Sequence, residues 1–318
     1  MVWDRIRARD GRAVPVEEWG GIAYALAAAT AARPDDWTLV PIIKVGRDLE
    51  ETALRFLRAL PGLDLSALRT VPEPNNRVEL LYRDNERRSE RLTGGVPAWT
   101  WAELEPVVHE LDALYVNFIS GFELTLQTAV QLRLSFDGPI YCDLHSVFLG
   151  VDSAGLRTPQ PLASWREWLR CFDIVQVNED ELELLAQAWG DPWRFAADVV
   201  GEELRVLFVT LGGRGAAYVA WRRAEAEPLR RRQRTAIARR TIVPHSAVTS
   251  EHISPAGGVR TGDPTGCGDV WGATCFLRLL GGATLVDAVV SANEAAARNV
   301  EHRGATGLHH YLLGRITH

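Results

Sequence analysis

The stretch Asp263-Pro264-Thr265-Gly266-Cys267-Gly268-Asp269 is followed at once by Val270–Leu280, whose apolar residues recur at helical spacing until Gly281-Gly282. It predicts a tight glycine turn that opens a helix, with Asp269 in the first turn. N–H groups at a helix start lack intrahelical partners and the dipole there is positive, so the turn suits a phosphate or a developing anion. A carboxylate at that place is a poor phosphate ligand but a good general base for a hydroxyl. From these residues alone, an ordinary helix cap with Asp in its first turn is an equally good interpretation.

Around this motif, apolar runs typical of strands alternate with helical patterns. The expected strands are Leu39–Val45, Ala113–Phe118, Pro139–Leu144, Ile174–Val177 and Val206–Leu211. The expected helices are Gly21–Ala32, Leu49–Leu60, Trp101–Leu111, Leu124–Leu134, Leu162–Cys171 and Glu179–Trp189. Because the strands are apolar on both faces, the alternation predicts a three-layer α/β/α fold with a mainly parallel central sheet.

Two stretches break this alternation. Arg77–Arg91 is typical of a β-hairpin with a turn at Asp84-Asn85, and Arg9–Trp19 could join it in a small separate sheet. We therefore expect one domain over residues 1–318, with a small β lid from about 9–19 and 77–91 that could pair with a second copy in a homodimer. Trp221–Arg240 is arginine-rich, and a solvated loop is its simplest interpretation.

Composition excludes several classes of protein. A chain of 318 residues with 47% hydrophobic and 24% charged residues forms a packed core, and a net charge of −6 argues against a general nucleic-acid binder. An RNA-binding role for Arg230, Arg231, Arg232 and Arg234 stays open as a weaker alternative. No apolar run approaches 18 residues and no signal segment opens the chain, so we expect a cytoplasmic protein without membrane partners. The four cysteines form no CxxC pair, which argues against structural zinc.

Five motifs together resemble the ribokinase-like (PfkB) carbohydrate and nucleoside kinases. They are Asp263–Asp269, Val177–Glu181, Val209–Ala216, the double glycine Gly20-Gly21, and Val45–Asp48. Their order and spacing agree with the family from about residue 2 to 307. Each motif is weak alone, but five in order are specific.

The resemblance implies a catalytic centre at the glycine turn. Asp269 would be the base that deprotonates a substrate hydroxyl, and the N–H groups of Gly266, Cys267 and Gly268 would form the anion hole for the transferred phosphoryl group. On the acceptor side, Asp4 and the Gly20-Gly21 pair would hold the substrate.

The same resemblance implies sites for ATP and cations. Residues bordering ATP would be Thr210, Gly212, Gly215 and, beside the adenine, Asn293. Asn178 and Glu181 would act on Mg²⁺, largely through water. A monovalent cation such as K⁺ would lie at Asp263 and Thr265, near the backbone of Gly304. Simpler alternatives are that Asn178 only caps a helix and that Gly212–Gly215 is only a β-turn.

Two further residues follow a strand expected at the ligand-binding edge of the sheet. Asp143 and His145 lie at the carboxyl end of the expected strand Pro139–Leu144. Open α/β sheets bind ligands at this end of their strands. Asp143 is therefore expected to contact the substrate. His145 could contact substrate or phosphate, or could make a structural hydrogen bond.

The acceptor side departs from the family pattern. Ala25 stands where the family often has an asparagine that contacts the sugar, and Glu51 stands where it often has a glycine. Asp4 lies so close to Met1 that almost nothing of the strand that usually precedes it remains. We expect the natural chain to begin upstream, with an apolar strand running into Val2-Trp3-Asp4, since losing a central strand leaves backbone groups unpaired.

The sequence thus predicts an ATP-dependent kinase that phosphorylates a hydroxyl of a sugar, sugar derivative or nucleoside. The alternative is a non-catalytic ligand sensor that keeps the fold, which Ala25 and the short start leave open.

Overall fold

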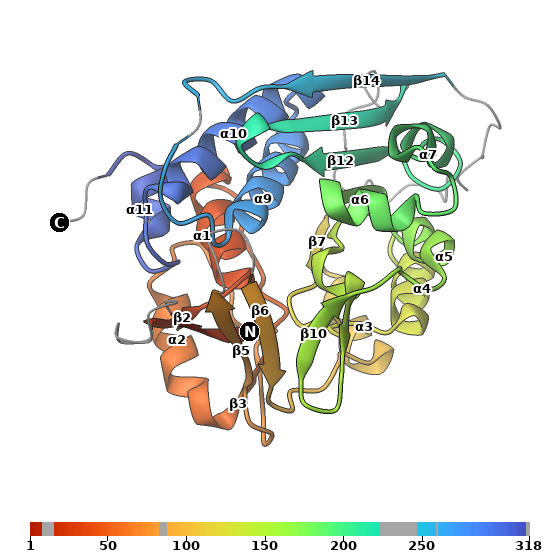
Figure 1. Ribbon diagram of the computed structural model, residues 1–318. Coiled ribbons are helices and arrows are strands. Elements are labelled where there is room, and N and C mark those ends of the chain that lie inside the picture. Colours follow the sequence, from red (N-terminus) through yellow and green to blue (C-terminus); the bar gives the residue numbers. More distant parts are fainter. Residues whose placement is uncertain (8–15, 83–87, 223–246, 259, 316–318) are drawn as a thin grey trace.

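The main sheet is built from apolar strands in the second half of the chain. The computed structural model describes residues 1–7, 16–82, 88–222, 247–258 and 260–315, and six strands pair there in the order β14-β13-β12-β11-β8-β7 (Figure 1). Their bounds are β7 (Leu114–Asn117), β8 (Ile140–Asp143), β11 (Ile174–Asn178), β12 (Val206–Thr210), β13 (Ala216–Trp221) and β14 (Val248–Ile253). β7, β8, β11 and β12 are parallel, whereas β13 and β14 are antiparallel additions. The predicted mainly parallel sheet is confirmed.

Helices cover both faces of this sheet because alternate strand residues enter two separate cores. Phe208 lies in one core and its neighbour Leu207 in the other. The first core contains residues of α1 (Ile22–Ala32), α2 (Glu50–Arg58), α9 (Cys267–Leu280), α10 (Leu285–Val300) and α11 (Leu308–Leu312). The second contains residues of α3 (Trp101–Val108), α4 (Leu126–Ser135), α5 (Trp165–Arg170), α6 (Glu179–Leu185) and α7 (Pro192–Val199). This is the predicted three-layer α/β/α arrangement.

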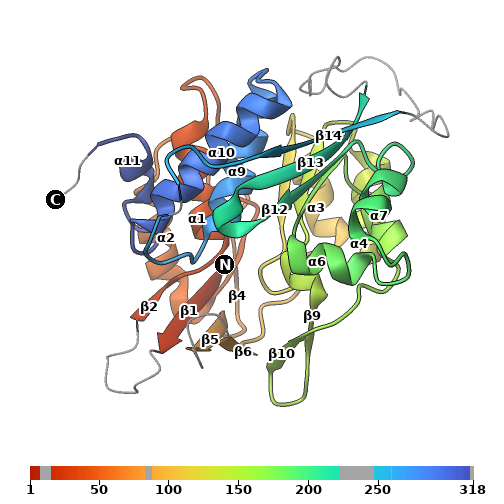
Figure 2. The same ribbon diagram turned by 45° about the horizontal axis from the view of Figure 1, so that its top comes forward.

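The lid is a six-stranded sheet in the order β2-β1-β5-β6-β10-β9, lying beside the layers (Figure 2). Its strands are β1 (Val2–Arg7), β2 (Val16–Trp19), β5 (Asn76–Tyr82), β6 (Arg88–Thr93), β9 (Leu149–Val151) and β10 (Leu156–Pro159). The expected hairpin pairs as β5 with β6, although its turn and residues 9–15 lie outside the described residues. The lid is larger than expected because the Gly155 turn, with φ of +80°, folds β9 and β10 into a second hairpin beside β6.

Asp4 occupies a different place from the one expected. The sequence suggested that Val2-Trp3-Asp4 ends a truncated strand of the main sheet, but these residues begin β1 of the lid. β1 pairs antiparallel with β2 and parallel with β5, so its ladders are made on both sides. Asp4 is therefore held by the lid sheet.

The expected strand Leu39–Val45 does not pair with the main sheet. Leu39 makes one isolated bridge to Leu63, and a regular strand appears only at β3 (Lys44–Gly46), which pairs with β4 (Arg69–Val71). Pro41 lacks an N–H group and interrupts the ladder between these two points.

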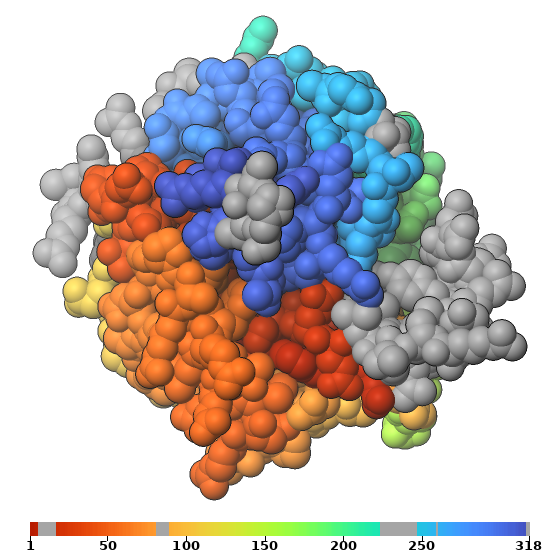
Figure 3. All heavy atoms as spheres, turned by 90° about the vertical axis from the view of Figure 1, so that its left-hand side faces the viewer, coloured from red at the N-terminus to blue at the C-terminus, as the bar shows by residue number. Residues whose placement is uncertain are grey.

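The first and last parts of the chain meet on one face of the molecule. Figure 3 shows the C-terminal part of the chain, in blue, beside the N-terminal part, in red and orange, and α11 packs against α1. In the described ranges, no helix combines the length and the apolar character that crossing a membrane would need.

Candidate active site

A cavity of about 250 Å³ lies between the lid sheet, the carboxyl ends of the main-sheet strands and the start of α9. The sequence-predicted residues that line it are Asp4, Gly21, Asp143, His145, Asn178, Glu181, Thr210, Thr265, Gly266, Cys267, Gly268 and Asp269. The structure thus brings together residues from all parts of the chain at the edge where open α/β sheets bind ligands.

The glycine turn begins α9 as predicted. Gly266 is the N-cap with φ of +75°, and a Cβ there would lie 2.3 Å from the Tyr24 ring, so glycine is required for both conformation and space. The Cys267 N–H donates to the Pro264 carbonyl at 3.1 Å and is used within the turn. Of the three N–H groups expected in an anion hole, that of Cys267 thus already has an acceptor within the turn. Burial raises the pKa of the Cys267 thiol to about 11, so it stays protonated at neutral pH.

Asp269 is held by a side chain from the neighbouring sheet. The Asn117 side-chain amide, at the end of β7, donates to Asp269 Oδ1 at 2.7 Å. Gln176 donates to the Gly268 carbonyl at 3.1 Å and to Asp143 Oδ2 at 3.2 Å, and accepts from the Tyr141 hydroxyl at 2.8 Å. These contacts fix the first turn of α9 against β7, β8 and β11.

On the opposite wall, Asp4 packs against the double glycine. A Cβ on Gly20 would lie 2.1 Å from Asp4 Oδ2, and one on Gly21 would lie 2.3 Å from Ile119. Gly20 therefore allows the Asp4 carboxylate to lie directly at the start of α1, where the helix dipole favours a negative charge. Asp4 and Asp269 both line the cavity, one from the lid and one from the main body.

Asp143, His145 and Glu181 form a charged group at the ends of β8 and β11. His145 Nδ1 and Glu181 Oε1 are 2.6 Å apart; burial opposes protonation of the imidazole, but Glu181 outweighs it and raises the pKa of His145 to about 9. Burial raises the pKa of Asp143 to about 7, with further increases from the charges of Glu181 and Asp269 and an opposing effect of His145. The carboxyl groups of Asp143, Glu181 and Asp269 thus face one cavity, as do those of Asp4 and Glu90, and added positive charge would relieve their repulsion.

Asn178 and Glu181 form a capping box at the start of α6. The Asn178 side-chain oxygen accepts from the Glu181 N–H at 2.9 Å, and Glu181 Oε2 accepts from the Asn178 N–H at 2.8 Å. Asn178 therefore caps α6, and both it and Glu181 also line the cavity. Such carboxylate and amide oxygens suit Mg²⁺, which proteins usually hold through water and phosphate.

The structure places the residues predicted to bind the nucleotide in two different environments. Thr210 lines the cavity at the end of β12, and Gly215, with φ of +91°, ends the short 3₁₀ turn Gly212–Arg214 just beyond it. Asn293 does not line the cavity: it is 6% exposed, accepts from Trp271 Nε1 at 2.9 Å and donates to the Ile253 carbonyl at 3.0 Å. Asn293 thus joins α10 to α9 and β14, outside the cavity that holds most of the expected residues.

The residues expected at a monovalent cation, Asp263 and Thr265, lie in contact within the glycine turn. Asp263 Oδ1 accepts from the Thr265 N–H at 2.9 Å, and the buried Thr265 hydroxyl has no hydrogen-bond partner among the described residues. Burial and the nearby Asp263 raise the pKa of Glu18, whose carboxylate also approaches Gly304. A buried hydroxyl beside two carboxylates fits a cation.

Sequence reasoning missed four residues of the site: Asn117, Gln176, Glu90 and Arg157. Arg157 of β10 is 7% exposed, lines the cavity, donates to the Ile119 carbonyl at 3.1 Å and approaches Glu90 of β6 at 3.4 Å. Arg157 lies outside every strand and helix expected from the sequence, so no local pattern indicates its burial. Asn117 and Gln176 had a weak one, because each stands at or near the carboxyl end of an expected strand.

Comparisons with known proteins agree with this geometry. The sequence profile of the pfkB family carbohydrate kinases matches residues 41–310, whereas no curated protein matches the chain. Similar solved structures include a pyrophosphate-dependent kinase in the ribokinase family, 16% identical, with a TM-score of 0.73, covering 99% of this chain and 97% of that one. A candidate ribokinase II from Escherichia coli, in complex with ATP and Mg²⁺, is 17% identical with a TM-score of 0.69, covering 99% and 96%. A Burkholderia thailandensis nucleoside kinase in complex with inosine is 17% identical with a TM-score of 0.65, covering 96% and 90%. The chain has the ribokinase-like fold and belongs to the pfkB family of carbohydrate kinases.

Proposed function

We propose that this protein transfers the γ-phosphoryl group of ATP to a hydroxyl of a sugar, sugar derivative or nucleoside. The observation that carries the proposal is the placement of Asp269. It lies at the start of α9 beside the glycine turn, its carboxylate is held at 2.7 Å by Asn117, and it lines the same cavity as Asp4 of the lid.

The catalytic roles follow from this placement. Asp269 takes the proton of the acceptor hydroxyl while Asp4 accepts hydrogen bonds from other hydroxyls of the same molecule. The N–H groups of Gly266 and Gly268 and the dipole of α9 stabilise the charge on the transferred phosphoryl. Phosphoryl transfer needs positioning and charge stabilisation rather than covalent catalysis, and a positioned base contributes about 10²–10⁴-fold.

The donor binds over the carboxyl ends of β11 and β12. Thr210, Gly212 and Gly215 border the nucleotide, while Asp143, Asn178 and Glu181 face its phosphates. Bound Mg²⁺ would neutralise phosphate charge there, held through water by these oxygens. Protonated His145, paired with Glu181, adds one positive charge on the phosphate side. The oxygens of Asp263 and Thr265 would hold a monovalent cation behind the turn.

The test is turnover of a panel of sugars, polyols and nucleosides with ATP and, separately, with pyrophosphate as donor. We expect ATP-dependent phosphorylation of at least one acceptor, and a 10²–10⁴-fold lower kcat in Asp269→Asn with an unchanged Kd for ATP. Asp287→Asn is the matched control, since Asp287 also stands in the first turn of a helix but is exposed and distant from the cavity.

Two outcomes would contradict the proposed catalysis, and a third would contradict ATP as the donor. Binding of an acceptor with no transfer from either donor would favour the ligand sensor. Near-normal kcat in Asp269→Asn would remove Asp269 as the base. Turnover with pyrophosphate but not with ATP would support the proposed acceptor chemistry and show that pyrophosphate, not ATP, is the phosphoryl donor.

A further inference from the structure

One face of the lid sheet is turned toward the active-site cavity and carries a charged pair with no role in the proposed reaction. Glu90 of β6 is the register partner of Leu80 on β5 and of Arg157 on β10, so the three side chains share a face. Asp4 of β1 is the partner of Val78, which lies two positions from Leu80 and therefore on the same face. All five residues line the cavity. The lid thus presents Asp4 at one end of the cavity and the charged pair at the other.

Arg157 is committed to neighbours within the protein. Its side chain is 3% exposed, its Nη1 lies 3.4 Å from Glu90 Oε2, and its Nη2 donates to the Ile119 carbonyl at 3.1 Å. If the guanidinium turned to a ligand, it would take the compensating charge away from a largely buried carboxylate, which is a costly change. Arg157 is therefore better suited to hold Glu90 in place than to bind an anionic ligand.

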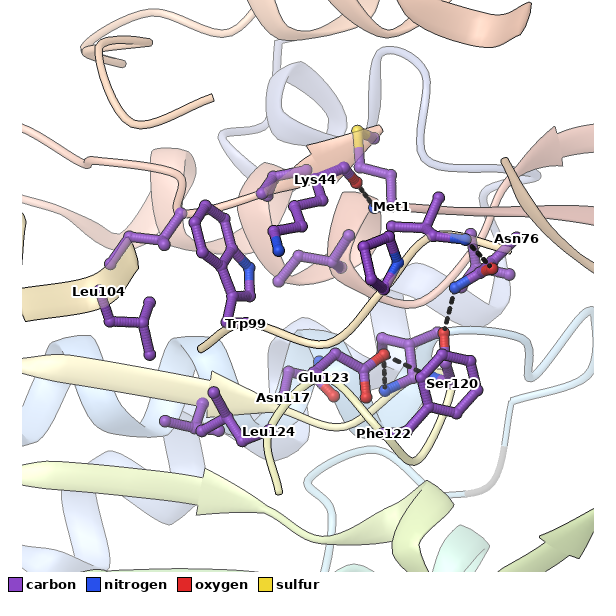
Figure 4. A pocket seen from close by; sticks show the side chains of 18 of the residues that line it. Met1, Lys44, Asn76, Trp99, Leu104, Asn117, Ser120, Phe122, Glu123 and Leu124 are labelled. Atoms are coloured by element: carbon purple, nitrogen blue, oxygen red, sulfur yellow. Dashed lines mark hydrogen bonds between the residues drawn. The ribbon is translucent and has the colours of Figure 1, made fainter. Parts of the chain in front are cut away.

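The loop that accepts the hydrogen bond of Arg157 is itself fixed, and Figure 4 shows the contacts around Ser120. Glu123 Oε1 accepts from the N–H groups of Ile119 at 3.1 Å and of Ser120 at 2.5 Å. Asn76 of β5 donates to the Ser120 hydroxyl at 3.1 Å. Because these bonds hold the Ile119 carbonyl, Arg157 has a fixed place at the cavity.

Glu90 is the more accessible member of the pair. Its side chain is 14% exposed and enters the cavity from β6. Asp4 enters from β1, two strand spacings away, which is about 10 Å. The two carboxylates are thus placed to contact different groups of one bound molecule, and the apolar side chains of Val78 and Leu80 would lie against its carbon skeleton between them.

The charges around Glu90 favour an uncharged or cationic ligand. Among the described residues that line the cavity, the cationic side chains are Arg157 and His145, and each is already paired with a glutamate. The carboxyl groups of Asp4 and Asp269 add negative charge on the acceptor side. A phosphate or carboxylate group beside Glu90 would therefore meet like charge.

We propose that Glu90, held in place by Arg157, is a second specificity residue for the acceptor. Its carboxylate accepts a hydrogen bond from a hydroxyl or amino group at the end of the acceptor that lies away from Asp4. An acceptor with a phosphate or carboxylate at that end is rejected, because binding would bring like charges together. This specificity rests on the proposed kinase function and narrows its acceptor to uncharged and cationic polyhydroxy compounds.

The test compares acceptors that differ in charge, with ATP as the donor. D-glucosamine, D-glucose and D-glucuronate form a series from cationic to anionic, and D-glucitol with D-gluconate and inosine with inosine monophosphate form two pairs. For each series or pair that is phosphorylated, we expect kcat/KM of the uncharged or cationic member to exceed that of the anionic member at least about 100-fold.

Glu90→Gln keeps the shape of the side chain and removes its charge. We expect KM for the uncharged acceptor to rise about 10-fold or more, because the hydrogen bond loses its charged member. KM for ATP should stay unchanged. The preference over the anionic member should fall at least about 10-fold, because the charge of Arg157 is then less compensated.

Glu79→Gln is the matched control. Glu79 is the register partner of Arg91 on the same two strands, and it stands one position from Leu80, so it lies on the opposite face of the lid. This variant should leave both KM values and the preference unchanged.

Arg157→Lys tests whether Arg157 acts through Glu90. Lysine keeps the positive charge but lacks the planar fork that spans Glu90 and the Ile119 carbonyl, so KM for the acceptor should rise. In the double variant Glu90→Gln/Arg157→Lys, KM for the acceptor should be no higher than in Glu90→Gln alone. Effects that multiply would show that Arg157 has a structural role independent of Glu90.

The remaining outcomes separate this specificity from the kinase function. Equal KM and equal preference in the parent and in Glu90→Gln would overturn the specificity and leave the kinase function intact, as would faster phosphorylation of the anionic members. If no compound is phosphorylated, calorimetric titration of the same compounds in the presence of Mg-ADP decides. An uncharged compound that binds the parent and binds Glu90→Gln about 10-fold more weakly supports the specificity without the kinase function. Binding of no uncharged or cationic compound contradicts both.

Discussion

At the scale of single residues, the site depends on which groups hold Asp269. Asn117 is the side chain that fixes its Oδ1, and it comes from a strand 152 residues away in sequence. The hydrogen bond stabilises the carboxylate form over the carboxylic acid. Asn117 is thus a positioning residue for the proposed base.

Removal of this contact should change the pH dependence of the reaction. We expect Asn117→Ala to lower kcat about 10-fold and to move the acid limb of its pH profile to higher pH, because the carboxylate loses a donor that favours its charged form. Asn117→Asp should move the limb further, since a like charge would then face Asp269. Measured kcat between pH 5 and 9 checks this; a lower kcat with an unshifted profile would point to a structural role alone.

Asp143 should give the parent enzyme a second pH effect. Its pKa of about 7 means that the group is mostly protonated at pH 6 and mostly ionised at pH 8. If the ionised form faces the Mg²⁺-bound phosphates, kcat/KM for ATP rises with pH through about 7 and levels off above. Asp143→Asn should abolish that rise and lower the plateau.

The stability of the same variant supplies an independent check. The folded-state pKa of Asp143 lies above its usual value of 3.8, so ionisation costs folding free energy, and this cost accumulates from about pH 4 to pH 7. Asn cannot ionise. The free energy of unfolding of Asp143→Asn minus that of the parent should therefore be larger at pH 8 than at pH 5, which means that the variant is relatively more stable at pH 8. The reverse order would contradict the raised pKa.

At the scale of elements, the start of α1 is matched to β1. Gly20 brings the helix start against the Asp4 carboxylate, and the closest approach of 2.1 Å leaves no room for a methyl group. The double glycine therefore serves the junction of lid and helix rather than the helix itself.

A methyl group at Gly20 should disturb acceptor binding selectively. Gly20→Ala should push Asp4 aside and raise KM for the acceptor about 10-fold or more, with KM for ATP unchanged, because the nucleotide contacts other elements. Gly95→Ala is the control: its nearest neighbour would be 3.4 Å away, and it should leave both constants unchanged. Equal rises in both KM values would show a general loss of structure.

Local sequence patterns predicted the elements that are stabilised by contacts between residues close together in the sequence. The α9 turn, the capping box at Asn178 and most strands and helices follow from spacing, glycine and apolar periodicity within about 15 residues. Arg157, Gln176 and the β9–β10 hairpin could not be predicted, because their roles depend on which strands the fold places beside them. The contacts of Asn293 could not be predicted for the same reason: its partners on α9 and β14 are 22 and 40 residues away.

At the scale of the whole molecule, the lid and the main body have unequal cores. The two large cores pack on the faces of the main sheet, whereas the described part of the lid has its own small cluster of Val2, Val78, Leu80 and Leu92. A small cluster contributes little burial to resist opening. The lid is thus suited to open for substrate entry while the main body stays folded.

This difference predicts two levels of stability. Amides of β5 and β6 should exchange with solvent by local opening, faster than those of β11 and β12, which require global unfolding. Leu92→Ala should speed exchange in the lid with little change in the main sheet, whereas Phe172→Ala should lower global stability by about 3–5 kcal/mol. Hydrogen exchange of the two variants checks this, and equal exchange rates in lid and main sheet would mean that they unfold as one unit.

The environment of Lys44 has a consequence for chemical labelling. It is the only lysine in the chain, it is 5% exposed, and its amino group donates to the Ala98 carbonyl and lies 4.7 Å from the centre of the Trp99 ring. An acylating reagent that attacks primary amines finds no exposed lysine side chain on the folded protein, although an unfolded chain offers one such side chain. The fraction of Lys44 that becomes acylated can be read from a peptide mass spectrum. It would therefore measure the fraction of molecules in which β3 has separated from the segment before α3.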